Sequence, residues 1–467
     1  MKKERAVPRI LLCAPASGSG KTLITCGILQ ALIHRGLWPA SFKCGPDYID
    51  PMFHKKVLGT TSGNLDTFFL DDESLRWLFT ERAKDCDIAV LEGVMGYYDG
   101  LGGISQKAST YDVARATRTP VILIINGKGA SASLAAQIQG FQNFKADSGI
   151  AGVILNHVNE PMYRLLKAYI EETCHVPVVG WLPELADVHL ESRHLGLVMP
   201  DEVEEIQKKL MQLAEVVEQT IDLEQLLAIA QTAPDISGID PLTKLPETDR
   251  VCEEKLRVGV AGDEAFCFLY EDNLRLLERL GAEIIPFSPI RDKQIPRDLD
   301  GLIFYGGYPE LYAAALSANK TMIASIRRAD ADGIPILAEC GGFMYLGESM
   351  EDIDGQVYPM VGLTEGKAYR TGKLVRFGYV DLTASQTSSG FFDGYEDIGI
   401  LKAHEFHYYD TTDNGCAFHA QKPAGKRNWD CMISRPNLLV GFPHIYYYAN
   451  PKFAQIFLDK CRRRKHL

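Results

Sequence analysis

The sequence predicts an α/β protein made of two doubly wound domains, and three features support this fold class. Short β-branched runs alternate with helical stretches in the first half, which indicates a parallel sheet with helices on both faces. A segment rich in proline and glycine interrupts this pattern, and the pattern then restarts. The chain of 467 residues is also longer than one ordinary core requires.

The first domain is expected to occupy residues 1–232, where strands and helices alternate. The expected strands are Ile10–Cys13, Ile88–Glu92, Val121–Ile125, Ala151–Asn156 and Val176–Trp181. The expected helices are Leu23–Arg35, Leu75–Arg82, Ser131–Phe141 and Tyr163–Thr173. A long helical stretch, Asp201–Ala230, is expected to close the domain.

A linker is expected at residues 233–255, because Pro234, Gly238, Pro241 and Pro246 stand there among many charged residues. The second α/β domain is then expected to fill residues 256–467. Its first strands are expected at Leu256–Ala261, Glu283–Phe287, Gly301–Tyr305 and Ile334–Glu339, with a helix at Tyr270–Leu280.

Composition excludes several classes of protein. Apolar residues make up 46% of the chain and charged residues 24%, as in soluble globular proteins. The formal net charge of -12 argues against nonspecific nucleic-acid binding. The chain has no apolar run of the roughly 20 residues that a membrane span needs, and no signal peptide is recognisable. Eleven scattered cysteines without paired CxxC motifs indicate reduced thiols, so we expect a cytoplasmic protein.

A glycine-rich turn follows the first expected strand and precedes the first expected helix. Gly18, Ser19 and Gly20 let backbone N–H groups converge on phosphate oxygens at a helix N-terminus. Lys21 is expected to reach the β- and γ-phosphates of ATP, and the Thr22 hydroxyl to bind Mg²⁺. Strict phosphate loops have glycine at the position of Pro15, so the match is incomplete.

Acidic residues in two further segments are expected to complete this nucleotide site. Asp47 and Asp50 flank a proline-bounded turn. Glu92 ends an apolar strand, and Asp99 lies in the loop that follows. Ligands of open α/β sheets gather at the carboxyl ends of the strands, where a carboxylate can hold Mg²⁺. Together with the loop, these acids favour a metal–nucleotide site in which Thr22 and Glu92 can hold the ion.

A cysteine at the end of an apolar strand is the candidate nucleophile of the second domain. Cys340 precedes two glycines and a helical stretch, so we expect an exposed thiol whose pKa the helix N-terminus lowers. The N–H group of Gly341 can bind a developing oxyanion. The glycine pair Gly306 and Gly307 offers the second oxyanion donor, for which we choose Gly307.

A nucleophilic thiol needs a base, and histidine is the usual one. His444 follows an apolar strand, which can bring it beside Cys340. His404 and His407 are the other candidates, and their spacing differs from that of the H-E-x-x-H zinc motif. Spacing alone leaves the role open between His444 and this pair.

Eight segments in the same order show that the chain resembles the cobyrinic acid a,c-diamide synthase family over nearly its whole length. These segments are Lys43–His54, Asn64–Asp66, Glu92–Gly96, Ser192–Leu197, Ala265–Tyr270, Gly306–Glu310, Cys340–Gly342 and His404–His407. The resemblance implies a dethiobiotin-synthetase-like P-loop ATPase domain followed by a class I glutaminase domain of flavodoxin-like fold.

The resemblance also implies roles for the candidate residues. Cys340 would attack the amide of L-glutamine, with His444 as general base. Asp47, Glu92 and Asp99 would handle Mg²⁺, the phosphoryl group and the substrate carboxylate during ATP-dependent amidation through an acyl phosphate. Most class I glutaminases have glutamate two residues after the histidine, where this chain has Tyr446, so the residue that orients His444 is not identified.

The expected substrate is cobyrinic acid or a related tetrapyrrole, and no nucleic-acid or membrane partner is expected. A sister enzyme that amidates nickel-sirohydrochlorin on the same scaffold is the alternative, because both substrates carry the same a and c acetate arms. A partition-type regulatory ATPase with a non-catalytic second domain is an alternative of another class. The macrocycle, the order of amidation, the nucleotide preference and the choice between monomer and homodimer are left open.

Overall fold

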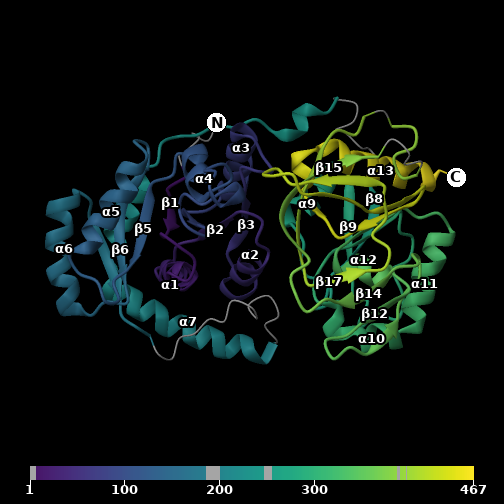
Figure 1. The fold of residues 1–467 in the computed structure, drawn as a ribbon, viewed down its shortest axis with the longest axis horizontal. Coiled ribbons are helices and arrows are strands. Elements are labelled where there is room, and N and C mark those ends of the chain that lie inside the picture. The colour runs from purple at the N-terminus through teal and green to yellow at the C-terminus, as the bar shows by residue number, and fades with distance from the viewer. Residues whose placement is uncertain (1–6, 186–199, 247–254, 386–389, 396, 467) are drawn as a thin grey trace. The chain divides into compact units, whose positions relative to one another are not determined.

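The computed structural model describes residues 7–185, 200–246, 255–385, 390–395 and 397–466 (Figure 1). The segment Ser192–Leu197, one of those that carry the family resemblance, lies outside the described residues. Contacts between Cα atoms divide the chain into two compact units, Met1–Asp240 and Pro241–Leu467. Among the described helices, none is long and apolar enough to cross a membrane.

The N-terminal unit is built on a seven-stranded parallel sheet in the order β3-β2-β4-β1-β5-β6-β7. The strands are β1 (Arg9–Cys13), β2 (Pro39–Cys44), β3 (Thr61–Leu65), β4 (Ile88–Glu92), β5 (Val121–Asn126), β6 (Ile150–Asn156) and β7 (Val178–Leu182). Every residue of β1 and β4 is buried, as expected when helices cover both faces of a parallel sheet. The predicted fold class of this domain is therefore confirmed.

Eight α-helices accompany this sheet in the described part of the unit (Figure 1). They are α1 (Lys21–His34), α2 (Ile49–Phe53), α3 (Asp72–Ala83), α4 (Thr110–Thr117), α5 (Ser133–Phe144), α6 (Glu160–Cys174), α7 (Pro200–Thr220) and α8 (Leu223–Gln231). The helical stretch expected over 201–230 consists of two helices, α7 and α8. Ile221 leaves the helix to bridge Gly180, and Asp222 caps α8 by accepting the Gln225 N–H at 2.9 Å.

The C-terminal unit contains a six-stranded sheet in the order β20-β21-β11-β10-β8-β9, parallel except for β20. These strands are β8 (Leu256–Ala261), β9 (Ala282–Phe287), β10 (Gly301–Phe304), β11 (Ile336–Glu339), β20 (Ile433–Arg435) and β21 (Leu438–Gly441). The helices are α9 (Glu271–Arg279), α10 (Ala313–Ala318), α11 (Lys320–Ala331), α12 (Gly341–Leu346) and α13 (Pro451–Lys465).

Two smaller sheets in the C-terminal unit were not predicted. A mixed four-stranded sheet has the order β13-β12-β14-β17 and consists of β12 (Ser349–Glu351), β13 (Val357–Pro359), β14 (Lys367–Arg370) and β17 (Tyr409–Thr411). An antiparallel sheet has the order β19-β18-β15-β16-β22, with β15 (Arg376–Ala384), β16 (Leu401–His407), β18 (Phe418–Gln421), β19 (Asn428–Cys431) and β22 (His444–Ile445). Its last pairing sets His404 opposite His444.

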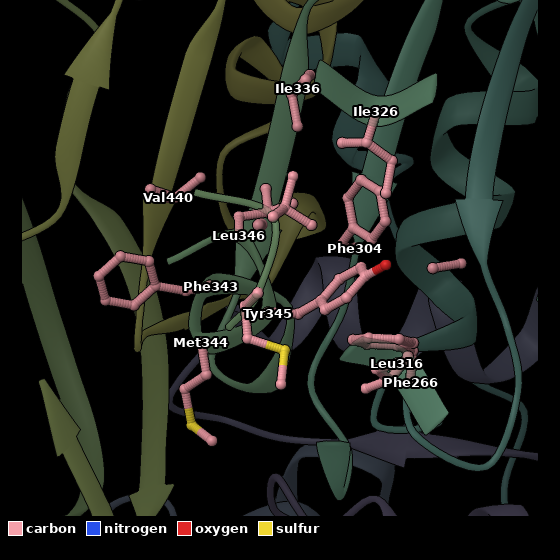
Figure 2. Close-up of a cluster of buried hydrophobic side chains, with 14 of the residues drawn as sticks. Phe266, Phe304, Leu316, Ile326, Ile336, Phe343, Met344, Tyr345, Leu346 and Val440 are labelled. Carbon is pink, nitrogen blue, oxygen red and sulfur yellow. The ribbon is translucent and has the colours of Figure 1, made fainter. Parts of the chain in front are cut away.

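Helix α12 is fixed in the core of the C-terminal unit. Phe343, Met344, Tyr345 and Leu346 are all buried, and they lie among apolar side chains from β10, β11, α10, α11 and β21 (Figure 2). Close packing leaves such a helix little freedom to shift. The residue directly before α12, Cys340, is therefore held in a defined position.

Candidate active sites

The phosphate loop of the N-terminal unit joins β1 to α1. Gly18 and Gly20 have φ values of 75° and 90°, which glycine adopts without the steric cost that other residues meet. Asn156, at the end of β6, donates a hydrogen bond to the Ser19 carbonyl at 3.0 Å. A Cβ atom at Gly20 would lie 2.3 Å from Nδ2 of Asn156, so this close approach also requires glycine.

Lys21 ties the phosphate loop to the segment after β4. Its Nζ donates to the Ala16 carbonyl at 3.0 Å and to the Met95 carbonyl at 2.7 Å. The side chain is buried, and burial followed by the charge of Lys43 lowers its pKa. The ammonium is thus held inside the loop, where phosphate oxygens of a nucleotide are expected.

A buried polar cluster lies at the start of α1. The Thr22 hydroxyl donates to Oε1 of Glu92 at 2.6 Å, and Nζ of Lys43 lies 2.8 Å from the same oxygen. Lys43 also approaches Oδ2 of Asp50 at 2.5 Å. Burial opposes the charge of Lys43, but Glu92 and Asp50 outweigh burial and raise its pKa well above the usual value. Lys43 therefore stays protonated between two carboxylates.

The two aspartates of the 47–50 turn differ in environment. The Oδ1 of Asp47 accepts the Ile49 N–H at 2.9 Å, and Asn64 donates to the Asp47 carbonyl at 2.7 Å. Burial, followed by the charge of Asp50, raises the pKa of Asp47 to about 6. Burial would also raise the pKa of Asp50, but Lys43 overcomes it, and the net shift is downward. Of the two aspartates, Asp50 is the one that pairs directly with Lys43.

Asp99 lies in the loop after β4 and contacts the phosphate loop indirectly. Its Oδ2 accepts the Gly96 N–H at 3.0 Å. A Cβ atom at Gly96 would lie 2.6 Å from the Pro15 carbonyl oxygen, so the two loops are in close contact. Thr22 and Lys43 both contact Glu92, and Lys43 also contacts Asp50. Asp99 lies at the neighbouring loop.

One of the residues predicted to bind Mg²⁺, Glu92, has an oxygen that a hard cation would satisfy. Oε2 of Glu92 is buried and has no hydrogen-bond partner among the described residues, although Nε2 of His54 lies 3.9 Å away. A buried carboxylate oxygen without a partner is costly unless a ligand satisfies it. Carboxylate and hydroxyl oxygens are the ligands that Mg²⁺ prefers.

Cys340 forms a strained turn between β11 and α12 in the C-terminal unit. Its φ of 48° lies in the left-handed region, and its N–H donates to the Gly441 carbonyl at 2.8 Å. The expectation of an exposed thiol with a lowered pKa was wrong. Cys340 is only 7% exposed, and burial, followed by the charge of Glu310, raises the pKa of the thiol. A hydrogen bond from the Gly341 N–H, at the start of α12, lowers the pKa but does not overcome this desolvation.

Glycines allow the backbone segments near the thiol to approach one another closely. A Cβ atom at Gly306 would lie 3.1 Å from Nε2 of His444 and 3.3 Å from Cβ of Cys340. A Cβ atom at Gly341 would lie 3.1 Å from the backbone nitrogen of Gly307. The two predicted oxyanion donors, Gly307 and Gly341, are thus neighbours in the structure.

The three candidate histidines lie in different settings. Nδ1 of His407 contacts the Tyr409 carbonyl oxygen at 2.6 Å, and its ring stacks on Phe442 with centroids 4.0 Å apart. Burial lowers the pKa of His407 to about 4 and that of His404 to about 3. The Nε2–Cε1 edge of His444 and the Cβ atom of Cys340 both lie close to Gly306. This geometry favours His444 as the base.

Sequence reasoning did not assign a role to Lys43 or His54, although both fall within a segment that carries the resemblance. Each is nearly inaccessible to solvent, and each contacts Glu92. A lysine near the end of an otherwise buried strand was the available signal, because lysine is almost never fully buried without a charged partner.

Comparison with protein families assigns the two halves of the chain separately. Residues 10–198 match the CobQ/CobB/MinD/ParA nucleotide binding domain. Residues 257–449 match the CobB/CobQ-like glutamine amidotransferase domain. The phosphate loop lies in the first match, and Cys340 and His444 lie in the second.

Curated relatives cover nearly the whole chain. A cobyrinate a,c-diamide synthase of Listeria innocua is 41% identical over 449 residues, which span 95% of this chain and 97% of the relative. The enzymes of the same name from Salmonella typhimurium and Caldanaerobacter subterraneus are 39% and 37% identical, each covering 97% of this chain and 98% of the relative. The chain is a glutamine-dependent amidating ligase that belongs to the cobyrinate a,c-diamide synthase family.

Proposed function

We propose that this protein amidates the a and c acetate carboxylates of cobyrinate, with ATP activating each carboxylate and glutamine supplying ammonia. The observation that carries the proposal is that one chain holds both halves of this chemistry. Thr22 and the buried Glu92 form a hydrogen-bonded pair at a phosphate loop, and Cys340 occupies a strained turn near His444. The names of the relatives support cobyrinate as the substrate.

In the proposed synthetase step, an oxygen of the substrate carboxylate attacks the γ-phosphorus of ATP. ADP leaves, and an acyl phosphate remains. Ammonia then attacks the carbonyl carbon, phosphate departs, and the nitrogen loses a proton to give the amide. Lys21 would face the phosphates, and Lys43 would hold Glu92 and Asp50 in place. Activation is needed because a carboxylate at neutral pH is a poor electrophile.

Thr22, Asp47 and Glu92 would hold Mg²⁺ in this site, with Asp99 near the phosphate loop to receive the substrate end. When bound, the ion neutralises charge that develops on the transferring phosphoryl group. The raised pKa of Asp47, which burial and the charge of Asp50 cause, agrees with a carboxylate whose charge a further cation would stabilise.

In the proposed glutaminase step, the Cys340 sulfur attacks the side-chain amide carbon of glutamine. His444 takes the thiol proton and passes it to the leaving ammonia, while the N–H groups of Gly307 and Gly341 bind the oxyanion. Water then hydrolyses the thioester to glutamate. The buried thiol requires such a base, because its raised pKa leaves little free thiolate at neutral pH.

Product analysis tests this function. Purified protein is incubated with ATP, Mg²⁺, glutamine and either cobyrinate or nickel-sirohydrochlorin, and the product masses are followed. We expect cobyrinate to undergo two successive exchanges of hydroxyl for amine, each dependent on ATP. Amidation of the nickel tetrapyrrole alone would overturn the substrate assignment. ATP turnover without a change in mass of either macrocycle would overturn the amidation itself and favour a regulatory ATPase.

A further inference from the structure

The imidazole of His444 lies between the thiol turn and a buried carboxylate. Its Nε2 and Cε1 lie against Gly306, and the Cβ atom of Cys340 lies against the same glycine. Its Nδ1, on another edge of the ring, lies 3.5 Å from Oε2 of Glu339. Glu339 is the last residue of β11 and directly precedes Cys340.

Several contacts fix the carboxylate and the turn that carries His444. Oε1 of Glu339 accepts the Ile445 N–H at 3.3 Å, and Glu339 is only 4% exposed. Asn273, on α9, donates to the Ile445 carbonyl at 2.7 Å and accepts the Tyr447 N–H at 2.8 Å. Hydrogen bonds between side chains and backbone groups therefore hold both Glu339 and the segment that follows His444.

Tyr446 does not take the place of this carboxylate. Its hydroxyl lies 3.3 Å from Oδ2 of Asp272, and its ring packs edge-on against Tyr270 with centroids 5.1 Å apart. Both partners lie at the start of α9. The side chain two residues after His444 is thus engaged elsewhere, and Glu339 is the acid that faces Nδ1.

We propose that Glu339 is the positioning residue of the glutaminase site, acting through His444; the proposal rests on the function proposed above. By accepting a hydrogen bond from Nδ1–H, the carboxylate leaves the lone pair of Nε2 directed at the Cys340 thiol. When the thiol proton moves to Nε2, the same carboxylate stabilises the imidazolium.

Other titratable groups near His444 are neutral or lie beyond the carboxylate. His404 faces His444 across the β16–β22 pairing, and burial keeps its pKa low. The hydroxyls of Tyr305 and Tyr447, 3.4 Å apart, lie near Glu339, and burial raises both phenol pKa values. Burial also raises the pKa of Glu339, which the contact with His444 opposes. Glu339 is therefore the acidic group whose charge acts directly on His444.

The test is Glu339→Gln, assayed for glutamine hydrolysis and, separately, for amidation with ammonia. We expect a fall in kcat for glutamine hydrolysis of roughly 10²- to 10⁴-fold, by analogy with amide replacements of orienting carboxylates in other hydrolases. Ammonia-dependent amidation is expected to stay unchanged. The KM for glutamine is expected to change little, because Glu339 acts through His444 and not on the substrate. Glu339→Asp should recover part of the rate.

Tyr446→Phe is the matched control, because it removes a buried polar group from the same turn without touching His444, and it should retain wild-type glutaminase activity. Normal glutamine hydrolysis by Glu339→Gln, while Cys340→Ala is inactive, would overturn the role of Glu339 and leave the proposed function standing. A slow Glu339→Gln whose rate Glu339→Asp does not recover even in part would also overturn it, because the loss would then come from disturbed packing and not from the missing carboxylate. Glutamine hydrolysis by Cys340→Ala would instead overturn the proposed function.

Discussion

Replacing Cys340 with alanine is expected to abolish glutamine-dependent amidation while ammonia-dependent amidation persists. Alanine cannot form the thioester, so glutamine hydrolysis should fall by about 10³-fold or more, as when other covalent catalysts lose their nucleophile. The substitution removes one sulfur atom from a turn that β11 and α12 hold on both sides, so the fold should survive. The measurement is the rate of amide formation with glutamine and with ammonium chloride.

Cys416→Ala is the control for this variant, because Cys416 is an exposed free cysteine of the same unit. It should leave both rates unchanged. If Cys340→Ala retained glutamine-dependent amidation, or if ammonia failed to restore the reaction in a folded variant, the proposed division of labour between the two units would be contradicted.

Lys21→Met is expected to suppress amidation with either nitrogen source. Methionine keeps most of the aliphatic stem but loses the ammonium that is held at the phosphate loop. Loss of a preorganised charge contact to the transferring phosphate is expected to lower the rate by roughly 10²- to 10³-fold. The readout is product formation with ammonia, which bypasses the glutaminase site.

Lys128→Met is the matched control, because Lys128 is an exposed lysine of the same unit whose Nζ lies 2.8 Å from Oε1 of Glu184 at the surface. Surface ion pairs of this kind contribute little to stability, so wild-type rates are expected. Amidation by Lys21→Met at a rate close to that of Lys128→Met would show that the loop does not bind the reacting phosphates.

The central strands of both sheets could be predicted from the sequence because they are continuous apolar runs. The predicted bounds Ile88–Glu92 and Leu256–Ala261 match β4 and β8. Strands β2 and β3 were missed because they contain polar residues that pair with each other inside the protein. Ser41, for example, donates to the Ser62 hydroxyl at 3.0 Å. Polar residues of this kind interrupt the hydrophobic pattern by which a strand is recognised in a sequence.

The candidate residues were found where a local motif places them, and missed where the fold brings distant segments together. The phosphate loop and the Cys340 turn each follow from one strand, one turn and one helix. The contact between Glu339 and His444 joins residues on β11 and β22, so no spacing in the sequence indicates it. The raised pKa of the Cys340 thiol likewise comes from burial by the assembled unit.

Transfer of oxygen from substrate to phosphate tests the central claim most directly, because it reports on the activation of the carboxylate itself. Cobyrinate labelled with oxygen-18 in its carboxylates is incubated with ATP, Mg²⁺ and ammonium chloride, and the released phosphate is analysed by mass spectrometry. If the carboxylate oxygen attacks the γ-phosphorus, one labelled oxygen should appear in phosphate for each amide formed. Amide formation with unlabelled phosphate would contradict the acyl-phosphate route.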